Sequence, residues 1–391
     1  MRRSMAVLAV GVALVATGCG GGGAAPRVSG VAPEKPVAQQ AAVKPSAKLG
    51  VEPADGADGV NPAGPFRVTV ADGSLASVAL TNSDGKQVAG ELAADEQSWV
   101  ATEPLGYNRT YTWSGTANGA DGKDAPISGS FHTVAPKRQV SASLNVGDDQ
   151  VYGVAMPLAV QFSAPVTDKA AVQKALQVQT SVPTKGAWAW LSDSEVHWRP
   201  EEYWKPNTKV MLKALLHGVA LGDGAYGLQD VTASFTIGRA LIATADTRTH
   251  RFVVTEDGRQ LFDFPASYGL ESDPGRVTRN GTHVVISKSA TVSMTNRKYG
   301  YEDVVVPWGV QISYNGEYVH GYEGSRWAQG SENVSHGCAN LAPENARAYF
   351  DEVIPGDPVV VTGSSVPLSA QDGTYYDWAL DWNAWTGKSA A

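Results

Sequence analysis

The sequence predicts a mainly β protein built from several domains. Its 391 residues exceed the size of one ordinary domain, so two to four domains are expected. Gly, Val, Thr, Ser and Trp are abundant, which favours strands over helices, and hydrophobic residues make up 43% of the chain, enough for several cores. Apolar and polar residues alternate along many short segments, and turn residues recur roughly every ten positions. Length, composition and alternation together indicate tandem β-domains.

Residues 1–18 are predicted to be a signal peptide. Arg2 and Arg3 precede an apolar run over residues 5–16 that is too short to span a bilayer. Ala-Thr-Gly-Cys at residues 16–19 follows, and it resembles the lipobox of bacterial lipoproteins. The resemblance implies cleavage before Cys19 and attachment of a lipid to its thiol. The alternative is an ordinary signal peptide followed by a chance cysteine.

Residues 19–48 are predicted to be the lipidated cysteine and a disordered tether, because they are rich in Gly, Ala, Pro and Lys. We therefore expect an exported protein that is anchored by lipid to the outer face of the cell membrane. The formal net charge of −8 argues against nucleic acid as a partner, because nucleic acid calls for a basic surface.

Residues 49–137 and 138–238 are predicted to be two tandem immunoglobulin-like β-sandwiches. A shift of 99 positions aligns Trp99 with Trp198 and brings residues 108–113 onto residues 207–212. Repeats of about 100 residues with short alternating strands are typical of such sandwiches. The alternative is a single larger β-domain with accidental similarity.

Residues 239–363 are predicted to be a further β-domain with one or two short helices. Asp-Gly at residues 257–258 lies between two alternating segments and predicts a hairpin turn. The segment 343–354, which begins with proline, predicts the one clear helix of this part. Its partial apolar stripe is Ala346, Phe350 and Val353.

Residues 364–391 form a Trp-rich tail. Trp378, Trp382 and Trp385 recur at helical spacing, so we expect them to form a stripe on a helix that packs against the body of the protein. Sugar binding by the same stripe is the weaker alternative.

Cys338 is the candidate nucleophile. If Cys19 carries a lipid, Cys338 has no disulfide partner, and an unpaired cysteine in an exported protein is notable. A thiol attacks carbonyl carbon well as a thiolate, and a nearby imidazole can take its proton. His320 and His336 are both candidates for this base, and the residues alone leave the choice open. The alternative is a buried, inert thiol.

Gly337 allows unusual backbone angles and a close approach of substrate. The amide N–H groups of Gly337 and Cys338 are candidates to face a developing oxyanion, and Asn340 is a candidate to hold the loop through its side chain.

The segment VHGYEGSRWAQGSENVSHGCAN, residues 319–340, resembles the signature of the L,D-transpeptidases. The matching residues are His320, Ser335, His336, Gly337, Cys338 and Asn340. Two immunoglobulin-like modules before such a domain, and a Trp-rich tail after it, resemble the mycobacterial and related actinobacterial members. The resemblance implies a mostly β catalytic domain over residues 239–363.

The resemblance also implies roles for individual residues. Cys338 attacks the substrate, His320 is the general base, and the main-chain carbonyl of Gly321 completes the triad. The oxyanion and substrate-binding positions implied by the resemblance are Tyr314, Trp327, Ser335, His336, Gly337 and Asn340. The chain departs from the family pattern at Thr278–Gly281, across residues 268–301, and at Ala339, which is smaller than the usual residue.

The implied activity is the formation of 3→3 cross-links between peptidoglycan stem tetrapeptides through a cysteine thioester, with no cofactor and no metal. The alternatives are an L,D-carboxypeptidase, an enzyme that anchors protein to peptidoglycan, and a non-enzymatic lipoprotein that binds the wall. β-Lactams of the carbapenem class are implied as covalent inhibitors. The sequence contains no HExxH or CxxC motif.

Overall fold

The computed structural model describes residues 44–373 and 375–390, and it confirms a mainly β protein. The predicted signal peptide, Cys19 and most of the predicted tether lie outside these residues. Lys48, the last residue of the predicted tether, is already the first residue of a strand. Within the described residues, no helix has both the length and the apolar composition needed to cross a membrane.

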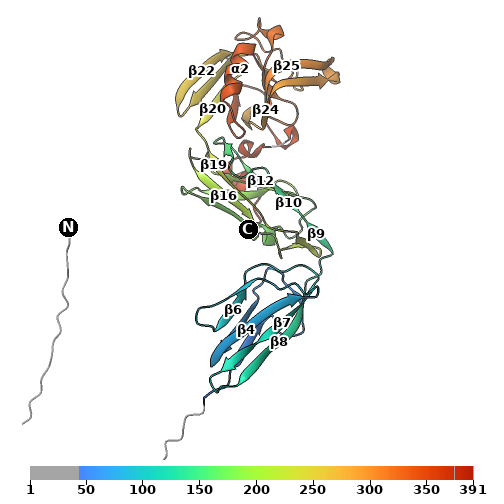
Figure 1. Ribbon diagram of the computed structural model, residues 1–391. Coiled ribbons are helices and arrows are strands. Elements are labelled where there is room, and N and C mark those ends of the chain that lie inside the picture. The colour runs from blue at the N-terminus through green and yellow to red at the C-terminus, as the bar shows by residue number, and fades with distance from the viewer. Residues whose placement is uncertain (1–43, 374, 391) are drawn as a thin grey trace, which may run out of the picture. The chain divides into compact units, whose positions relative to one another are not determined.

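The first sandwich pairs two four-stranded sheets, β1-β3-β6-β5 and β2-β8-β7-β4 (Figure 1). Its strands are β1 (Lys48–Glu52), β2 (Ala57–Val60), β3 (Arg67–Ala71), β4 (Gly73–Asn82), β5 (Gly90–Leu92), β6 (Ser98–Ala101), β7 (Thr110–Gly119) and β8 (Asp124–Thr133). Alternation in β7 buries Tyr111 and Trp113 while Thr110 and Thr112 face solvent. Trp113 meets Trp99 edge to face, with ring centroids 5.7 Å apart, at the centre of the core.

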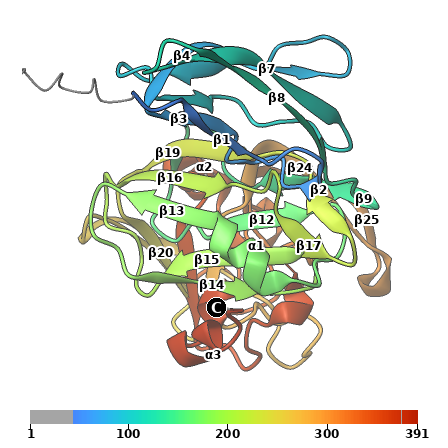
Figure 2. The same ribbon diagram turned by 90° about the horizontal axis from the view of Figure 1, so that it is seen from below.

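The second sandwich contains the sheets β10-β12-β15-β14 and β11-β19-β16-β13, together with a small sheet β17-β18-β9 (Figure 2). Its elements are β9 (Arg138–Val140), β10 (Ala142–Leu144), β11 (Val151–Tyr152), β12 (Leu158–Phe162), α1 (Lys169–Ala175), β13 (Leu176–Thr180), β14 (Gly186–Trp190), β15 (Glu195–Pro200), β16 (Lys209–Ala214), β17 (Ala220–Gly222), β18 (Ala225–Gly227) and β19 (Val231–Ile237). Trp198 in β15 and Leu212 in β16 are buried, as are their repeat partners Trp99 in β6 and Trp113 in β7. The aligned positions therefore serve the core in both sandwiches.

The third domain, predicted over residues 239–363 to be catalytic, contains a five-stranded sheet, β22-β21-β20-β28-β23, and a four-stranded sheet, β24-β25-β26-β27. Its strands are β20 (Leu241–Asp246), β21 (Arg251–Glu256), β22 (Arg259–Pro265), β23 (Gly281–Val284), β24 (Ser287–Asn296), β25 (Tyr301–Gln311), β26 (Tyr318–Gly321), β27 (Ala339–Leu341) and β28 (Pro358–Thr362). The predicted hairpin is confirmed, because β21 and β22 pair through a turn in which Asp257 and Gly258 both have positive φ.

Helix α2 (Pro343–Glu352) begins at the predicted proline. The predicted apolar stripe is partly wrong. Ala346 is buried, but Tyr349 is the large side chain that enters the core, and Phe350 is only half-buried. Val353 is buried as an extended residue after the helix has ended.

The Trp-rich tail packs on the body as expected, but it does not form one helical stripe. Trp378 lies in a short 3-10 turn (Asp377–Ala379), the chain becomes extended at Leu380, and Trp382 and Trp385 lie in α3 (Trp382–Thr386). Because the helix is interrupted, helical spacing does not explain why the three tryptophans lie close to one another. Figure 2 shows α3 beside β14 of the second sandwich, where the indole N–H of Trp385 donates to the Ala187 carbonyl at 2.9 Å.

Candidate active site

The candidate residues converge because two short strands pair in parallel. β26 and β27 are hydrogen-bonded neighbours, with Val319 opposite Ala339 and His320 opposite Asn340. Cys338 immediately precedes β27, so the pairing brings it to the side of the sheet that carries His320. Both side chains line one cavity of about 240 Å³. The seventeen residues between them in the sequence form the end of β26 and the loop that leads to β27.

His320 is buried, and its Nδ1 lies 3.0 Å from the Gly321 carbonyl oxygen. A carbonyl oxygen can only accept a hydrogen bond, so this contact places the proton on Nδ1 and leaves the lone pair on Nε2. Burial lowers the pKa of His320 to about 4, with a smaller opposing effect from the Gly321 hydrogen bond. The ring is therefore neutral near pH 7 and is able to accept a proton at Nε2.

The Cys338 thiol is in the protonated state near pH 7. Burial raises the pKa of Cys338 to about 12, although the backbone N–H of Tyr318 favours the thiolate. The thiol donates a weak hydrogen bond to the Gly316 carbonyl, with 3.7 Å between Sγ and oxygen. Cys338 and His320 are thus a neutral thiol and a neutral imidazole on the wall of one cavity, not a resting thiolate and imidazolium.

His336, the other candidate base, is held by aromatic rings of the β24–β25 hairpin. The rings of Tyr299 and Tyr301 each lie 5.1 Å from the imidazole, centroid to centroid. Burial lowers the pKa of His336, and the charge of Arg276 adds to this effect. His336 lines the same cavity as Cys338, but its ring packs against the hairpin.

Ser335 fixes the backbone around the cysteine. Its hydroxyl donates to the Cys338 carbonyl at 2.6 Å and accepts from the Gly337 N–H at 3.2 Å. In this structure the Gly337 N–H is therefore engaged by Ser335, and its role toward an oxyanion stays a prediction. Gly337 itself has a φ of 120°, a value that residues with a Cβ rarely adopt.

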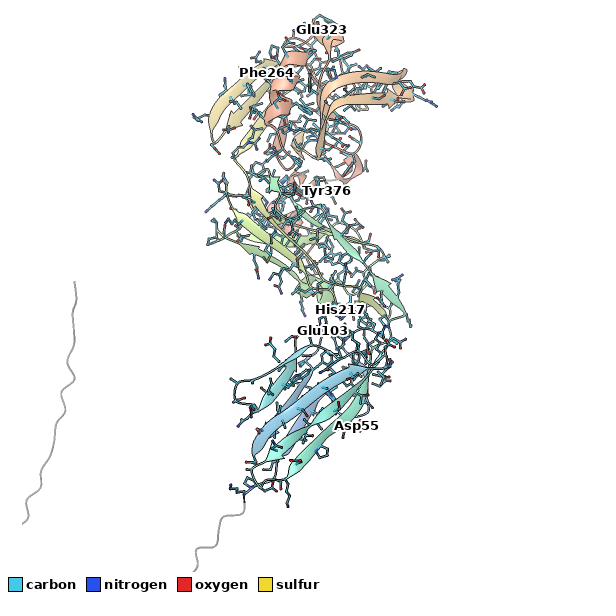
Figure 3. All side chains as sticks on the ribbon, viewed as in Figure 1. Asp55, Glu103, His217, Phe264, Glu323 and Tyr376 are labelled. Carbon is cyan, nitrogen blue, oxygen red and sulfur yellow. The ribbon has the colours of Figure 1, made fainter. Side chains whose placement is uncertain are left out.

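Asn340 supports the loop that follows β26. Its side-chain amide donates to Ser325 Oγ at 3.2 Å, which ties β27 to that loop. The same loop carries Trp327, whose side chain is 67% exposed and lines the cavity. Figure 3 shows Glu323, at the start of this loop, at the end of the catalytic domain opposite Tyr376 of the tail.

The structure does not bring Tyr314 to the cavity. Its side chain is 56% exposed, and its Cβ packs near Gly373 of the tail segment. Tyr301 and Tyr322 line the cavity instead. The sequence analysis did not single out these two tyrosines: Tyr301 ends the stretch 268–301 that departs from the family pattern, and Tyr322 is not one of the matching residues of the segment 319–340.

Apolar residues of the β24–β25 hairpin form one wall of the cavity, and the sequence did not single them out either. These are Met294, Val304 and Val306. Alternation along β24 and β25 was a signal that could have found them, since residues 304 and 306 must face the same side of a strand. Which side faces Cys338 depends on the pairing of β25 with β26, which is long-range information.

Comparison with known proteins agrees with this geometry. The bacterial Ig domain model matches residues 57–220, and the L,D-transpeptidase catalytic domain model matches residues 241–361. The chain is 48% identical over 351 residues to L,D-transpeptidase 5 of Mycobacterium tuberculosis (strain ATCC 25618 / H37Rv), over 88% of this chain and 78% of that protein. It is 40% identical over 351 residues to L,D-transpeptidase 2 of strain CDC 1551 / Oshkosh, over 88% and 85% of the two chains.

Among solved structures, the LD transpeptidase LdtMt1 in complex with imipenem is similar, with a TM-score of 0.50 and 36% identity. The match covers 58% of this chain and 100% of that chain. The active-site geometry, the matching catalytic-domain model and the extent of the similarity to L,D-transpeptidase 5 lead to one conclusion: the chain belongs to the L,D-transpeptidase family.

Proposed function

We propose that this protein forms 3→3 cross-links in peptidoglycan, with Cys338 as nucleophile and His320 as general base. The observation that carries the proposal is the parallel pairing of β26 with β27, which lines one cavity with both side chains. The substrates are the tetrapeptide stems of peptidoglycan, one as acyl donor and one as acyl acceptor. Membership of the L,D-transpeptidase family supports this substrate class.

In the first half-reaction, Cys338 Sγ attacks the carbonyl carbon between an L-centre and the terminal D-Ala of the donor stem. The thiol proton passes to His320 Nε2 as the S–C bond forms, since the resting pair is neutral. The Gly321 carbonyl holds the imidazole and stabilises the imidazolium that forms. His320 then gives the proton to the leaving amine, so that D-Ala departs and a thioester remains on Cys338.

We assign the oxyanion of the tetrahedral intermediate to the main-chain N–H of Cys338, because the Gly337 N–H is bound to Ser335. Ser335 and Asn340 hold the backbone on either side of the nucleophile. His336 and Trp327 contribute to the walls along which the stem lies.

In the second half-reaction, a side-chain amine of diaminopimelate in a neighbouring stem attacks the thioester. The C–N bond forms and the C–S bond breaks, while His320 takes a proton from the attacking amine and passes it to the departing sulfur. Water in place of the amine would make the protein an L,D-carboxypeptidase, and a protein amine would make it an anchoring enzyme.

Incubation of the full-length protein with disaccharide-tetrapeptide, followed by mass analysis, tests the proposal. Wild type should release D-Ala and produce a cross-linked dimer, whereas Cys338→Ala and His320→Gln should not. Free tripeptide without dimer would instead indicate hydrolysis. If wild type and Cys338→Ala gave the same unreacted material, the non-enzymatic alternative of a wall-binding lipoprotein would replace the proposal.

Acylation of Cys338 by a carbapenem gives a second test. The imipenem complex of LdtMt1 supports this expectation. Intact mass should increase by one carbapenem in wild type and remain unchanged in Cys338→Ser.

We also propose that the protein is exported and held at the outer face of the membrane by a lipid on Cys19, with residues 1–18 removed. The lipobox-like segment at residues 16–19 supports this location. Wild type should sediment with membranes, and Cys19→Ala should be found in the soluble exported fraction. The same division between the membrane and soluble fractions for wild type and Cys19→Ala would contradict the proposed lipid anchor.

A further inference from the structure

Glu317 is a buried carboxylate in the immediate surroundings of the nucleophile, and the mechanism above gives it no role. It directly precedes β26, the strand that carries His320, and its side chain is only 5% exposed. Carboxylates are almost never buried to this extent without a partner that compensates for the lost solvation. Its partners therefore indicate why it is there.

Those partners leave the carboxylate incompletely satisfied. Oε1 accepts the Arg279 N–H at 3.1 Å, but Oε2 is buried without a hydrogen bond. The nearest positively chargeable group to Oε2 is His283, with 3.7 Å between Nδ1 and the oxygen. Burial raises the pKa of Glu317, whereas His283 and Arg279 favour the ionised form and Asp372 opposes it.

The carboxylate packs against the backbone that holds Cys338. A Cβ built on Gly337 would lie 3.5 Å from Glu317 Cγ and 3.6 Å from Oε1. Gly316, the residue before Glu317, accepts the weak hydrogen bond of the thiol, and Tyr318, the residue after it, directs its N–H at the sulfur. Glu317 thus lies between two residues that contact Cys338 Sγ, and its side chain packs against Gly337, the residue before Cys338.

Other ionisable groups also surround the thiol. His320 of β26 and Tyr301 of β25 line the same cavity as Cys338, and the Cys338 sulfur raises the pKa of both Tyr301 and Tyr318 in addition to the larger effect of burial. Glu317 is the one carboxylic acid in this group, so it is the residue that adds a negative charge beside the thiol when it is ionised. Burial raises the pKa of Cys338 and the charge of Glu317 raises it further.

We propose that Glu317 is a positioning residue of the nucleophile: its carboxylate supports the Gly337 backbone, and its negative charge keeps the Cys338 thiol protonated until His320 takes the proton. The inference rests on the proposed role of Cys338. As a consequence, the thiol reacts slowly with general electrophiles. It becomes nucleophilic when substrate is bound and His320 accepts its proton.

Alkylation of Cys338 in the full-length protein tests this charge effect without requiring transpeptidation. The rates of reaction with neutral iodoacetamide and with anionic iodoacetate are followed on the Cys338 peptide by mass spectrometry at pH 8. The variants are Glu317→Gln, which is neutral, and Glu317→Asp, which keeps the charge. Glu332→Gln is the matched control, because Glu332 is an exposed acid in the same loop as Cys338.

Glu317→Gln should be alkylated by iodoacetamide about tenfold faster than wild type, the change expected for a thiol pKa that falls by about one unit. The ratio of the iodoacetate rate to the iodoacetamide rate should also increase, because the anionic reagent is no longer repelled. Looser packing would raise both rates together and leave the ratio unchanged. Glu317→Asp and Glu332→Gln should keep the wild-type ratio.

An unchanged ratio in Glu317→Gln, or an equal increase in Glu317→Asp, would overturn the proposal. Glu317→Met, which is also neutral and of similar length, is used if thermal unfolding shows that Glu317→Gln is not folded. Loss of folding in both neutral variants, with Glu317→Asp still folded, would limit Glu317 to a structural role. Absence of cross-linking in wild type, with these alkylation results intact, would contradict the proposed function and not the charge effect.

Discussion

His197 of the second sandwich donates through Nδ1 to Asp377 of the C-terminal tail, with 2.8 Å between the two atoms. Its Nε2 lies 2.9 Å from Glu195 Oε1, so both ring nitrogens face carboxylates. Both nitrogens act as donors only in the imidazolium form. A segment that follows the catalytic domain in sequence is thereby tied to the second sandwich by a buried charge pair.

The first prediction concerns the pH dependence of stability. Burial opposes the charged form of His197, but Asp377 and Glu195 outweigh it and raise the pKa to about 9. Because the folded-state pKa lies above the unfolded value of about 6.5, the stabilisation is fully present below pH 6.5 and is lost as pH rises through 9. A shift of this size corresponds to roughly 3 kcal/mol.

Thermal unfolding of wild type should therefore show a falling midpoint between pH 6.5 and 9. His197→Gln should have a lower midpoint at pH 6.5 and a flatter dependence on pH. His132→Gln, on the first sandwich, is the matched control and should behave as wild type. The same slope in wild type and His197→Gln would contradict the assignment.

The second prediction concerns Arg199, which lies inside a cage of tail indoles. Its guanidinium carbon is 4.6, 5.2 and 4.8 Å from the ring centroids of Trp378, Trp382 and Trp385, and its Nη2 donates to the Leu380 carbonyl at 2.8 Å. Arg199→Met should lower the free energy of unfolding by about 2–4 kcal/mol, because cation–π contacts and a hydrogen bond to the tail are lost.

Arg199→Lys keeps the charge but loses the planar group, so its loss should be intermediate. Urea unfolding followed by tryptophan fluorescence measures both variants. Equal stability of Arg199→Met and wild type would show that the cage contributes nothing.

The third prediction concerns the pH dependence of acylation. Because the pKa of His320 is lowered to about 4, the base remains unprotonated throughout the neutral and mildly acidic range. The rate of carbapenem acylation should therefore not decline with a midpoint near 6.5, the value for an unperturbed histidine, and should decline only as pH approaches 4. A stopped-flow pH series over pH 4–8 measures this. A midpoint near 6.5 would mean that the imidazole is solvated in the working enzyme.

The fourth prediction separates backbone strain from packing at Gly337. Its φ of 120° disfavours any Cβ, while a methyl group added there would meet only ordinary van der Waals contacts. Gly337→Ala should cost about 1–2 kcal/mol of stability and reduce acylation at least tenfold, since the Cys338 backbone moves to relieve the strain. Urea unfolding and acylation rates measure the two effects.

Gly258→Ala is the matched control, because Gly258 also has a positive φ, lies in the β21–β22 turn, and has open space around it. It should lose similar stability and keep full acylation. Full acylation in Gly337→Ala as well would show that the site tolerates a shift of this backbone.

Local chemistry made several elements predictable. Asp257 and Gly258 form the expected turn because both adopt a positive φ, which few other pairs do easily. Pro343 begins α2 because a missing N–H costs nothing in the first turn. The shift of 99 positions aligned Trp99 with Trp198, and both are buried because the two sandwiches place them at corresponding core positions.

Long-range pairing made the rest unpredictable from the residues. Spacing left His320 and His336 as equal candidates, and the register of β26 with β27 is what sets His320 beside the cysteine segment. Tyr314 was expected at the site, yet the chain turns it toward Gly373, while Tyr301 and Tyr322 reach the cavity from a hairpin and a loop.

The amino-acid sequence was therefore sufficient for the β class, the repeated sandwiches and the choice of Cys338 as candidate nucleophile, because these depend on local alternation and on rare residues at short spacing. The protonation state of the Cys338–His320 pair, the burial of Glu317 beneath it and the His197–Asp377 link were determined by folding alone. Each depends on desolvation and on contacts between residues distant in sequence, and these exist only once the chain has folded.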